Sequence, residues 1–319
     1  MVERRKRLLL GAFGTVIALV LGTAYALKDP SPIGYFTSGD AQNRFLAAYD
    51  DAMDEMPTPD RTLDVRTTYG VVRLYRFAGA DPGAEPLVLL PGRASASPLW
   101  ADNLPSLLKR RSVYTIDLLG EPGYSVQQRP ITTPADHARW LHEALLALPE
   151  PRVHLLGWSI GGWTAANLAV REPAKIASVA LFDPVVVFGD LSGQAVIRSL
   201  PASVKWFPKS WRDSFASWTA NDAPVEDEPV ARMIEEGLQS YVIKLSAPTR
   251  PTDEQLRSLR MPTLVVFGGE SRMHDPKAGA ENARRVLRHG TVKSYDDASH
   301  AVPAEYPDRV AADVDRLLT

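Results

Sequence analysis

The sequence contains no cysteine, and this absence alone removes several kinds of chemistry. Disulfide bonds, thiolate metal sites and cysteine nucleophiles are all excluded. Histidine is scarce as well: the 6 histidines form no H-x-x-H or H-E-x-x-H pattern, so we do not expect a metal site. We expect no other cofactor either. The net charge of -2 gives no general attraction to nucleic acid, which we do not expect as a partner.

The N-terminus is the one strong outlier in composition. Four basic residues at 4–7 precede an uncharged run over 8–27, which has the ~20 apolar residues that a helix needs to cross a bilayer. Basic residues on this side stay in the cytoplasm and send the rest of the chain outward. The end of the run, Ala24-Tyr25-Ala26, also fits a signal-peptidase site. We therefore expect either a membrane anchor, which the length of the run favours, or a secreted protein cleaved after Ala26.

The rest of the 319 residues alternates between strand-like and helix-like segments, with 45% hydrophobic residues to build a sizeable core. Buried strands that alternate with helices predict an α/β fold, a mainly parallel β-sheet flanked by helices. The expected strands are 63–68, 71–77, 86–92, 112–120, 152–158, 175–183, 261–269 and 291–296, and the expected helices are 40–56, 133–148, 159–170, 277–289 and 304–318.

One interval, 184–255, breaks the alternation. A structureless loop of that length is implausible inside a compact domain, so we predict a small helical insertion between two strands of the sheet. The predicted organisation is a signal anchor or signal peptide (1–27), a linker and helix (28–60), the first part of the core (61–183), the helical cap (184–255) and the second part of the core (256–319).

The segment HLLGWSIGGW contains a G-x-S-x-G pattern centred on Ser159. It follows a predicted strand and opens a predicted helix, the context in which a nucleophilic serine is held on a sharp turn. Ser159 becomes reactive only if a base takes its proton and backbone N–H groups stabilise the oxyanion. Ile160, directly after the serine, is one expected donor. Arg93, which follows the tight turn permitted by Gly92, is the other.

These motifs resemble the α/β-hydrolase fold family from about residue 60 to the C-terminus. The matching segments are LLPGRA, DLLGEPGYS, GWSIGG and DASHAVPAEYPDRV. The resemblance implies a serine hydrolase in which His300, after the last strand and before the terminal helix, is the general base. His274 is the only rival, because it lies in a loop near the site.

The family also has an acid that orients the base and completes a catalytic triad. Three carboxylates are candidates for it, because the family's usual position, three residues after Gly268, is Ser271 in this chain. Some family members, such as haloalkane dehalogenases, carry the acid one strand earlier, where this chain has Asp183. Glu270 is displaced by one residue from the usual site, and its longer side chain could compensate. Asp275 lies deeper in the loop and suits a helix cap. We favour Asp183 narrowly over Glu270.

The predicted cap carries Trp211, Phe215 and Trp218 at i, i+4, i+7 spacing on one helical face. In the family, an insertion here covers the active site. This stripe either forms an apolar wall of the substrate pocket, together with Gly92 and Trp158, or attaches the cap to the domain beneath it.

We therefore expect an esterase-like serine hydrolase, of carboxylesterase type, that acts on a small and partly apolar substrate through an acyl-enzyme on Ser159. A peptidase or acyltransferase of the same fold is an alternative. So is a non-catalytic binding or sensing protein, which the unusual acid position keeps open. The membrane is an expected partner through 8–27 if that run is not cleaved, and the catalytic domain is then extracytoplasmic.

Overall fold

The structure is a computed structural model that describes residues 31–203, 208–225 and 227–318. By its internal contacts the chain divides into Met1–Pro32 and Ile33–Thr319, and all the elements below belong to the second unit. The expected N-terminal anchor or signal over 8–27 lies outside the described residues.

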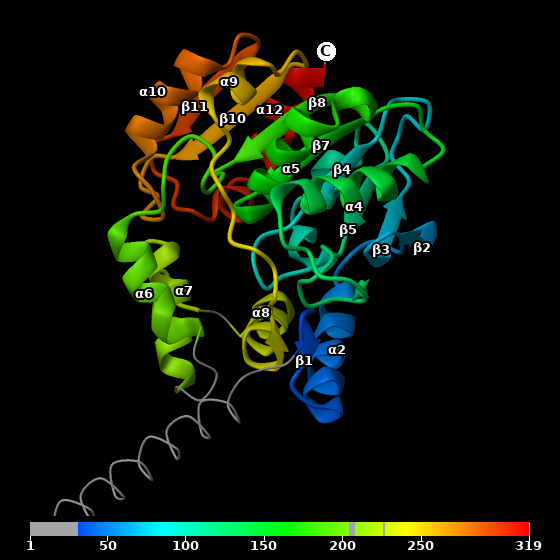
Figure 1. Cartoon of the computed structure of the whole chain (residues 1–319), viewed down its shortest axis with the longest axis vertical. Helices are drawn as coiled ribbons and strands as arrows, with labels where there is room; N and C mark the ends of the chain where they lie inside the picture. The colour runs from blue at the N-terminus through cyan, green and yellow to red at the C-terminus, as the bar shows by residue number, and fades with distance from the viewer. Residues whose placement is uncertain (1–30, 204–207, 226, 319) are drawn as a thin grey trace, which may run out of the picture. The chain divides into compact units, whose positions relative to one another are not determined.

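A mixed sheet forms the centre of this unit (Figure 1). In the described part of the chain it has nine strands, and eight of them follow the order β11-β10-β8-β7-β4-β5-β3-β2 while β6 pairs with β3. The strands from β11 to β5 are parallel, whereas β2, β3 and β6 pair antiparallel, which confirms a mainly parallel α/β sheet. Their bounds are β2 Arg61–Thr67, β3 Gly70–Phe77, β4 Leu87–Leu90, β5 Val113–Ile116, β6 Val126–Gln127, β7 Val153–Trp158, β8 Ile176–Phe182, β10 Thr263–Gly268 and β11 Gly290–Tyr295.

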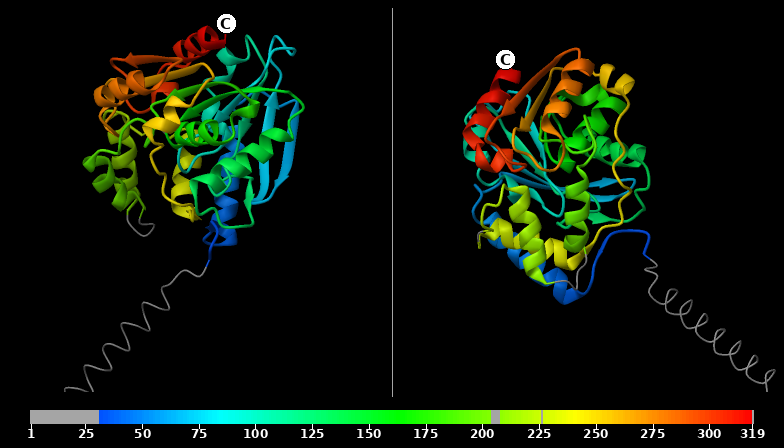
Figure 2. Two further views of the ribbon diagram at one scale, coloured as in Figure 1. Left: turned by 45° about the horizontal axis from the view of Figure 1, so that its top comes forward. Right: turned by 90° about the vertical axis from the view of Figure 1, so that its left-hand side faces the viewer.

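Helices cover both faces of the sheet, so the central strands are buried on both sides and largely apolar (Figure 2). Val88 and Leu90 of β4 belong to the core with α4, α5 and α10. Leu87 and Leu89, which alternate with them, belong to the second core with α3 and α12. These helices are α3 Leu104–Leu107, α4 Pro134–Leu146, α5 Ile160–Arg171, α10 Pro276–Val286 and α12 Pro307–Leu318.

Most predicted elements are present, with their ends shifted by a few residues. The helix predicted at 133–148 begins at Pro134, and the side chain of its N-cap Thr133 accepts a hydrogen bond from Asp136 N. The strand predicted over 112–120 already ends at Ile116. The next residue, Asp117, is fully buried, and its carboxylate instead receives backbone N–H groups from neighbouring loops.

The interval after β8 contains the helices α6 Gly193–Ser203, α7 Lys209–Thr219 and α8 Pro229–Ser240, which we call the cap. The last of these helices, α8, ends at Ser240. Tyr241–Val242 form strand β9, antiparallel to β1 at Tyr35–Phe36. The early helix α2, Gly39–Met53, lies beside α8 (Figure 1) and shares a core cluster with it.

A close approach of backbones positions α5 against the sheet. A Cβ atom at Gly161 would lie 2.0 Å from the carbonyl oxygen of Leu90 at the end of β4. Replacing glycine by alanine inside a helix normally stabilises it, but here the steric clash outweighs that gain and makes the substitution destabilising. We expect Gly161→Ala to lower the free energy of unfolding by about 3 kcal/mol in urea denaturation.

The matched control is Gly193→Ala in α6, where a Cβ would meet nothing within 4 Å. This control should leave stability unchanged or slightly higher. If Gly161→Ala lost no more stability than Gly193→Ala, α5 would be able to move away from β4 without lowering the free energy of unfolding.

Candidate functional site

Ser159 occupies the turn between β7 and α5 in a strained backbone conformation. Its φ of 57° and ψ of -118° lie outside the regions that ordinary residues adopt. The surroundings hold it there, because Ser159 N donates to Phe182 O at 3.1 Å and a Cβ at Gly157 would lie 2.3 Å from Gly161 O. Such strain persists only where packing enforces it, and it occurs most often at functional sites.

His300 faces this serine from the loop after β11. Its Nε2 lies 2.9 Å from Ser159 Oγ. Its main chain is fixed on both sides, since His300 N donates to Thr219 O of the cap at 3.2 Å and His300 O accepts from Trp158 Nε1 at 2.8 Å. The imidazole is therefore oriented toward the serine by both the cap and the sheet.

Asp183 completes a hydrogen-bonded chain of three side chains. It follows β8 directly, is fully buried, and has a φ of 41°. Its Oδ2 lies 2.5 Å from Nδ1 of His300, the ring nitrogen that does not face Ser159. The structure thus joins three of the residues singled out in the sequence.

Three further donors reach the carboxylate of Asp183. Gly268 N donates to Oδ1 at 3.0 Å and Ser271 Oγ donates to Oδ2 at 2.6 Å. His274 Nε2 lies 3.1 Å from Oδ1. Ser271, found where the family pattern has an acid, therefore donates a hydrogen bond to a carboxylate from the neighbouring strand. The sequence offered no signal for the contact of His274, which depends on pairing between β8 and β10.

Asp183 and His274 shift each other's pKa. Burial by itself raises the pKa of Asp183, but the two imidazoles, His274 first and then His300, outweigh it and hold the pKa well below its usual range. For His274 burial lowers the pKa, while the charge and hydrogen bond of Asp183 raise it more, so its net pKa is raised. The cluster therefore favours an ionised Asp183.

The other two acid candidates make different contacts. Glu270 is exposed, and its Oε2 accepts from Asn221 Nδ2 of the cap at 3.0 Å. Asp275 caps α10, where its Oδ1 accepts from the main-chain N–H groups of residues 277 and 278 at 3.1 and 3.0 Å. The structure places Asp183, rather than either of these carboxylates, at His300.

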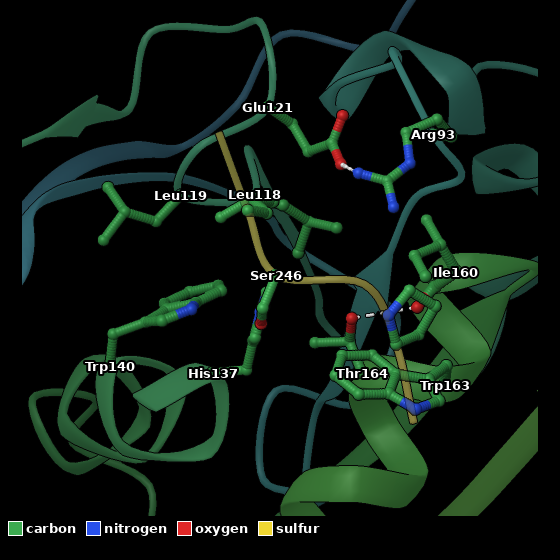
Figure 3. Close-up of a pocket in the computed structure, with 12 residues that line it drawn as sticks. Arg93, Leu118, Leu119, Glu121, His137, Trp140, Ile160, Trp163, Thr164 and Ser246 are labelled. Atoms are coloured by element: carbon green, nitrogen blue, oxygen red, sulfur yellow. Dashed lines mark hydrogen bonds and ion pairs between the residues drawn. The ribbon is translucent and has the colours of Figure 1, made fainter. Parts of the chain in front are cut away.

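The loop after β4 passes close to Ser159. An ideal Cβ at Gly92 would lie 3.9 Å from Ser159 Cβ, so a side chain there would approach the serine. The guanidinium of Arg93 pairs with the buried carboxylate of Glu121 at 2.5 Å, and the other oxygen of Glu121 accepts from Ala94 N at 3.0 Å (Figure 3). The motif DLLGEPGYS contains Glu121, but nothing in its pattern indicates this contact. This carboxylate fixes the loop that carries the expected oxyanion donor.

A small cavity lies beside this loop, between Arg93, Ile160 and Trp163 (Figure 3). Its volume is about 10 Å³, which is room for one water molecule. Buried Nε2 of His137 and Oγ of Ser246 line it without a hydrogen-bond partner among the described residues. A cavity of this size cannot hold an organic substrate, for which several hundred Å³ is usual.

The aromatic residues predicted as one stripe of the cap differ in their exposure to solvent. Trp218 is buried and stacks on Phe215 with ring centroids 6.1 Å apart, whereas Trp211 is 47% exposed. The end of α7 rests on the loop after β10, because Arg272 binds Asp222 through two contacts of 2.9 Å. Trp218 therefore lies at the attachment of the cap to the core.

The part of the chain that the structure describes has neither a metal cluster nor a membrane-spanning helix. No group of three or more His, Asp or Glu residues there is arranged to hold a metal ion. None of the helices described is long and apolar enough to cross a membrane.

Known proteins resemble this chain over most of its length. The model of the alpha/beta hydrolase family matches residues 87–313. An uncharacterised carboxylesterase of Bacillus subtilis (strain 168) is 24% identical over 271 residues, which are 83% of this chain and 88% of that protein. The crystal structure of naproxen esterase from Bacillus subtilis has a TM-score of 0.81 at 23% identity, covering 88% of this chain and 99% of that chain. The crystal structure of a membrane phospholipase A has a TM-score of 0.70 at 20% identity and covers 98% of both chains.

The cluster around Asp183 makes stability depend on pH in a defined window. A carboxyl with a lowered pKa stabilises the fold above its unfolded value of about 3.9, and this contribution is lost as the pH falls. An imidazole with a raised pKa stabilises the fold below its unfolded value of about 6.5, and this contribution is lost as the pH rises. Both shifts are present here, so both contributions are complete between about pH 4 and 6.5.

We expect Asp183→Asn to lose most stability relative to the wild type near pH 5, with a smaller difference at pH 3 and at pH 9. Urea denaturation at these pH values measures the difference. Glu270→Gln, which removes an exposed carboxylate of the neighbouring loop, is the control. A stability difference for Asp183→Asn that stays constant with pH would contradict the charge coupling.

Proposed function

Because the chain belongs to the alpha/beta hydrolase family, we propose that it is a serine carboxylesterase whose catalytic residues are Ser159, His300 and Asp183. The observation that carries this proposal is the continuous chain of hydrogen bonds from Ser159 Oγ through His300 to Asp183, with distances of 2.9 and 2.5 Å. A nucleophile, a base in contact with it and a group that orients the base are the parts required for acyl transfer.

In the proposed reaction, His300 Nε2 takes the proton of Ser159 as the serine oxygen attacks the ester carbonyl carbon. The backbone N–H groups of Ile160 and Arg93 stabilise the oxyanion that forms. The C–O bond to the alcohol breaks, and His300 gives its proton to the departing oxygen. A water molecule then loses a proton to His300 and attacks the acyl-enzyme, which releases the carboxylic acid and returns the proton to Ser159. Asp183 holds Nδ1 and stabilises the imidazolium throughout.

An ester is the substrate class that the comparisons favour, since similar proteins are named as a carboxylesterase and a naproxen esterase. A peptidase or acyltransferase would use the same three residues, and no contact on the described surface favours either. A non-catalytic binding protein is a weaker alternative, because it would have no need for an oriented base beside a strained serine. We propose a small, partly apolar ester as the substrate.

Hydrolysis of p-nitrophenyl esters of increasing acyl length tests this proposal. We expect turnover by the wild type and a loss of at least about 10⁴-fold in kcat for Ser159→Ala and for His300→Ala. Asp183→Asn should lose about 10³- to 10⁴-fold, because the imidazole then adopts the wrong tautomer. No turnover by a folded wild type with any ester would favour the binding-protein alternative.

Glu270→Gln is the matched comparison for the acid, since it changes the other carboxylate near the site by the same chemistry. It should stay within about threefold of the wild type, as expected for a surface contact with Asn221. If Glu270→Gln lost activity while Asp183→Asn kept it, the acid would have been assigned to the wrong residue.

We further propose that residues 8–27 bring the enzyme to a membrane, with the catalytic domain outside the cytoplasm. The basic residues at 4–7 support this orientation. The likeness to a membrane phospholipase A makes an ester of a lipid the second candidate substrate, since an anchored enzyme meets such esters directly.

Fractionation of cells that produce the full chain tests the anchor. We expect the protein in the membrane fraction after carbonate washing, with residues 1–27 still present by mass spectrometry. A soluble extracytoplasmic chain that begins at Leu27 would instead show a cleaved signal. Full-length protein in the cytosol would contradict both forms of the proposal.

A further inference from the structure

Two imidazoles share the carboxylate that orients the proposed base. His300 Nδ1 lies 2.5 Å from Oδ2 of Asp183, and His274 Nε2 lies 3.1 Å from Oδ1. The side chain of His274 is only 4% exposed, and it reaches this position from the loop between β10 and α10. His274 takes no step in the proposed reaction.

We propose that His274 is a positioning residue of the same site, which shares Asp183 with His300 and sets how much negative charge the carboxylate presents to the base. The inference rests on the proposed esterase mechanism. The contact between His274 and Asp183 is present whatever reaction the site carries out. It makes the working unit a chain of four side chains, Ser159, His300, Asp183 and His274.

The geometry around Asp183 supports a specific role for His274. An ionised carboxylate has about four acceptor positions, and here four donors fill them: His300, His274, Ser271 Oγ and Gly268 N. The ring of His274 also packs edge-on against Phe267, with centroids 5.6 Å apart at 82°, which fixes its orientation. Of the four donors, His274 is the only one besides the base that can change its charge near neutral pH.

A protonated His274 would weaken the support that Asp183 gives to the base. When His300 accepts the serine proton, two imidazolium ions then share one carboxylate, so each receives less of its stabilisation. The raised pKa of His274, in which Asp183 outweighs the effect of burial, increases the pH range over which this happens. The positive charge of His274 therefore reduces the support that Asp183 can give to the base during the reaction.

Other charged groups face this cluster from the surrounding elements. Asp275 at the start of α10 acts on His274 and raises its pKa, although less than Asp183 does. Arg272 is paired with Asp222 of the cap, and Glu270 is bonded to Asn221. On the other side, Glu305 accepts hydrogen bonds from the main chain and hydroxyl of Ser299, next to His300.

The test is the pH profile of kcat/KM for His274→Gln in the full chain. Glutamine keeps an N–H donor for Asp183 but cannot become charged. We expect the acid limb of the profile to move to higher pH by about one unit, because Asp183 then no longer shares its negative charge with a second imidazole. Ser271→Ala removes an uncharged donor from the same carboxylate, so it should lower the rate without moving the limb.

His154→Gln is the control for loss of a buried histidine, since His154 bonds to Ser178 inside the sheet, away from this cluster. Its profile should match the wild type. A His274→Gln profile with the same acid limb as the wild type, lowered equally at every pH, would overturn the proposal and leave His274 a purely structural role.

Histidine titrations by NMR in the full chain keep the two proposals separable. They need no turnover, so the coupling between His274 and His300 is measured even if no ester is hydrolysed. We expect the resonances of His274 in the wild type to change in two linked steps, and the pH dependence of the His300 resonances to change in His274→Gln. If that variant does not fold, independent single-step titration of the two histidines in the wild type would overturn the inference.

Discussion

The buried carboxylate of Asp183 is the group on which the rest of the site depends. It follows β8, and its partners lie on β10 or on the loops after β10 and β11. A charge inside a protein is very unfavourable unless it is paired and fully hydrogen-bonded. The loops of 268–274 and 299–300 must therefore be in place before Asp183 can be buried, and the same condition orients the base.

The parallel sheet explains why these groups can meet. β4, β7, β8 and β10 are neighbours and run in one direction, so the loops that follow them emerge at the same edge. Arg93, Ser159, Asp183 and Ser271 each lie just beyond one of these strands. The cap contacts this edge through Thr219, which accepts from His300 N, and through the pairing of Asp222 with Arg272. A displaced cap would consequently disturb the loops that carry His300 and Ser271.

The sequence predicted the sheet, the helices around it and the positions of Ser159 and His300, because each carries a local pattern. The choice between Asp183 and Glu270 could not be decided locally: β8 and β10 are adjacent, and a carboxylate at the end of either strand could have reached the base. Ser271 and His274 select Asp183 through contacts across 88 and 91 positions of the chain, which no spacing rule conveys. Glu121 was missed for the same reason, since its partner Arg93 lies on another strand's loop.

The central claim is that Ser159 is an activated nucleophile. Labelling of the full chain with a fluorophosphonate, followed by mass spectrometry of the modified peptide, tests this most directly because it requires no knowledge of the substrate. We predict one equivalent of label on Ser159, formed far more slowly in His300→Ala. A folded wild type that takes no label, or takes it at another serine, would contradict the account.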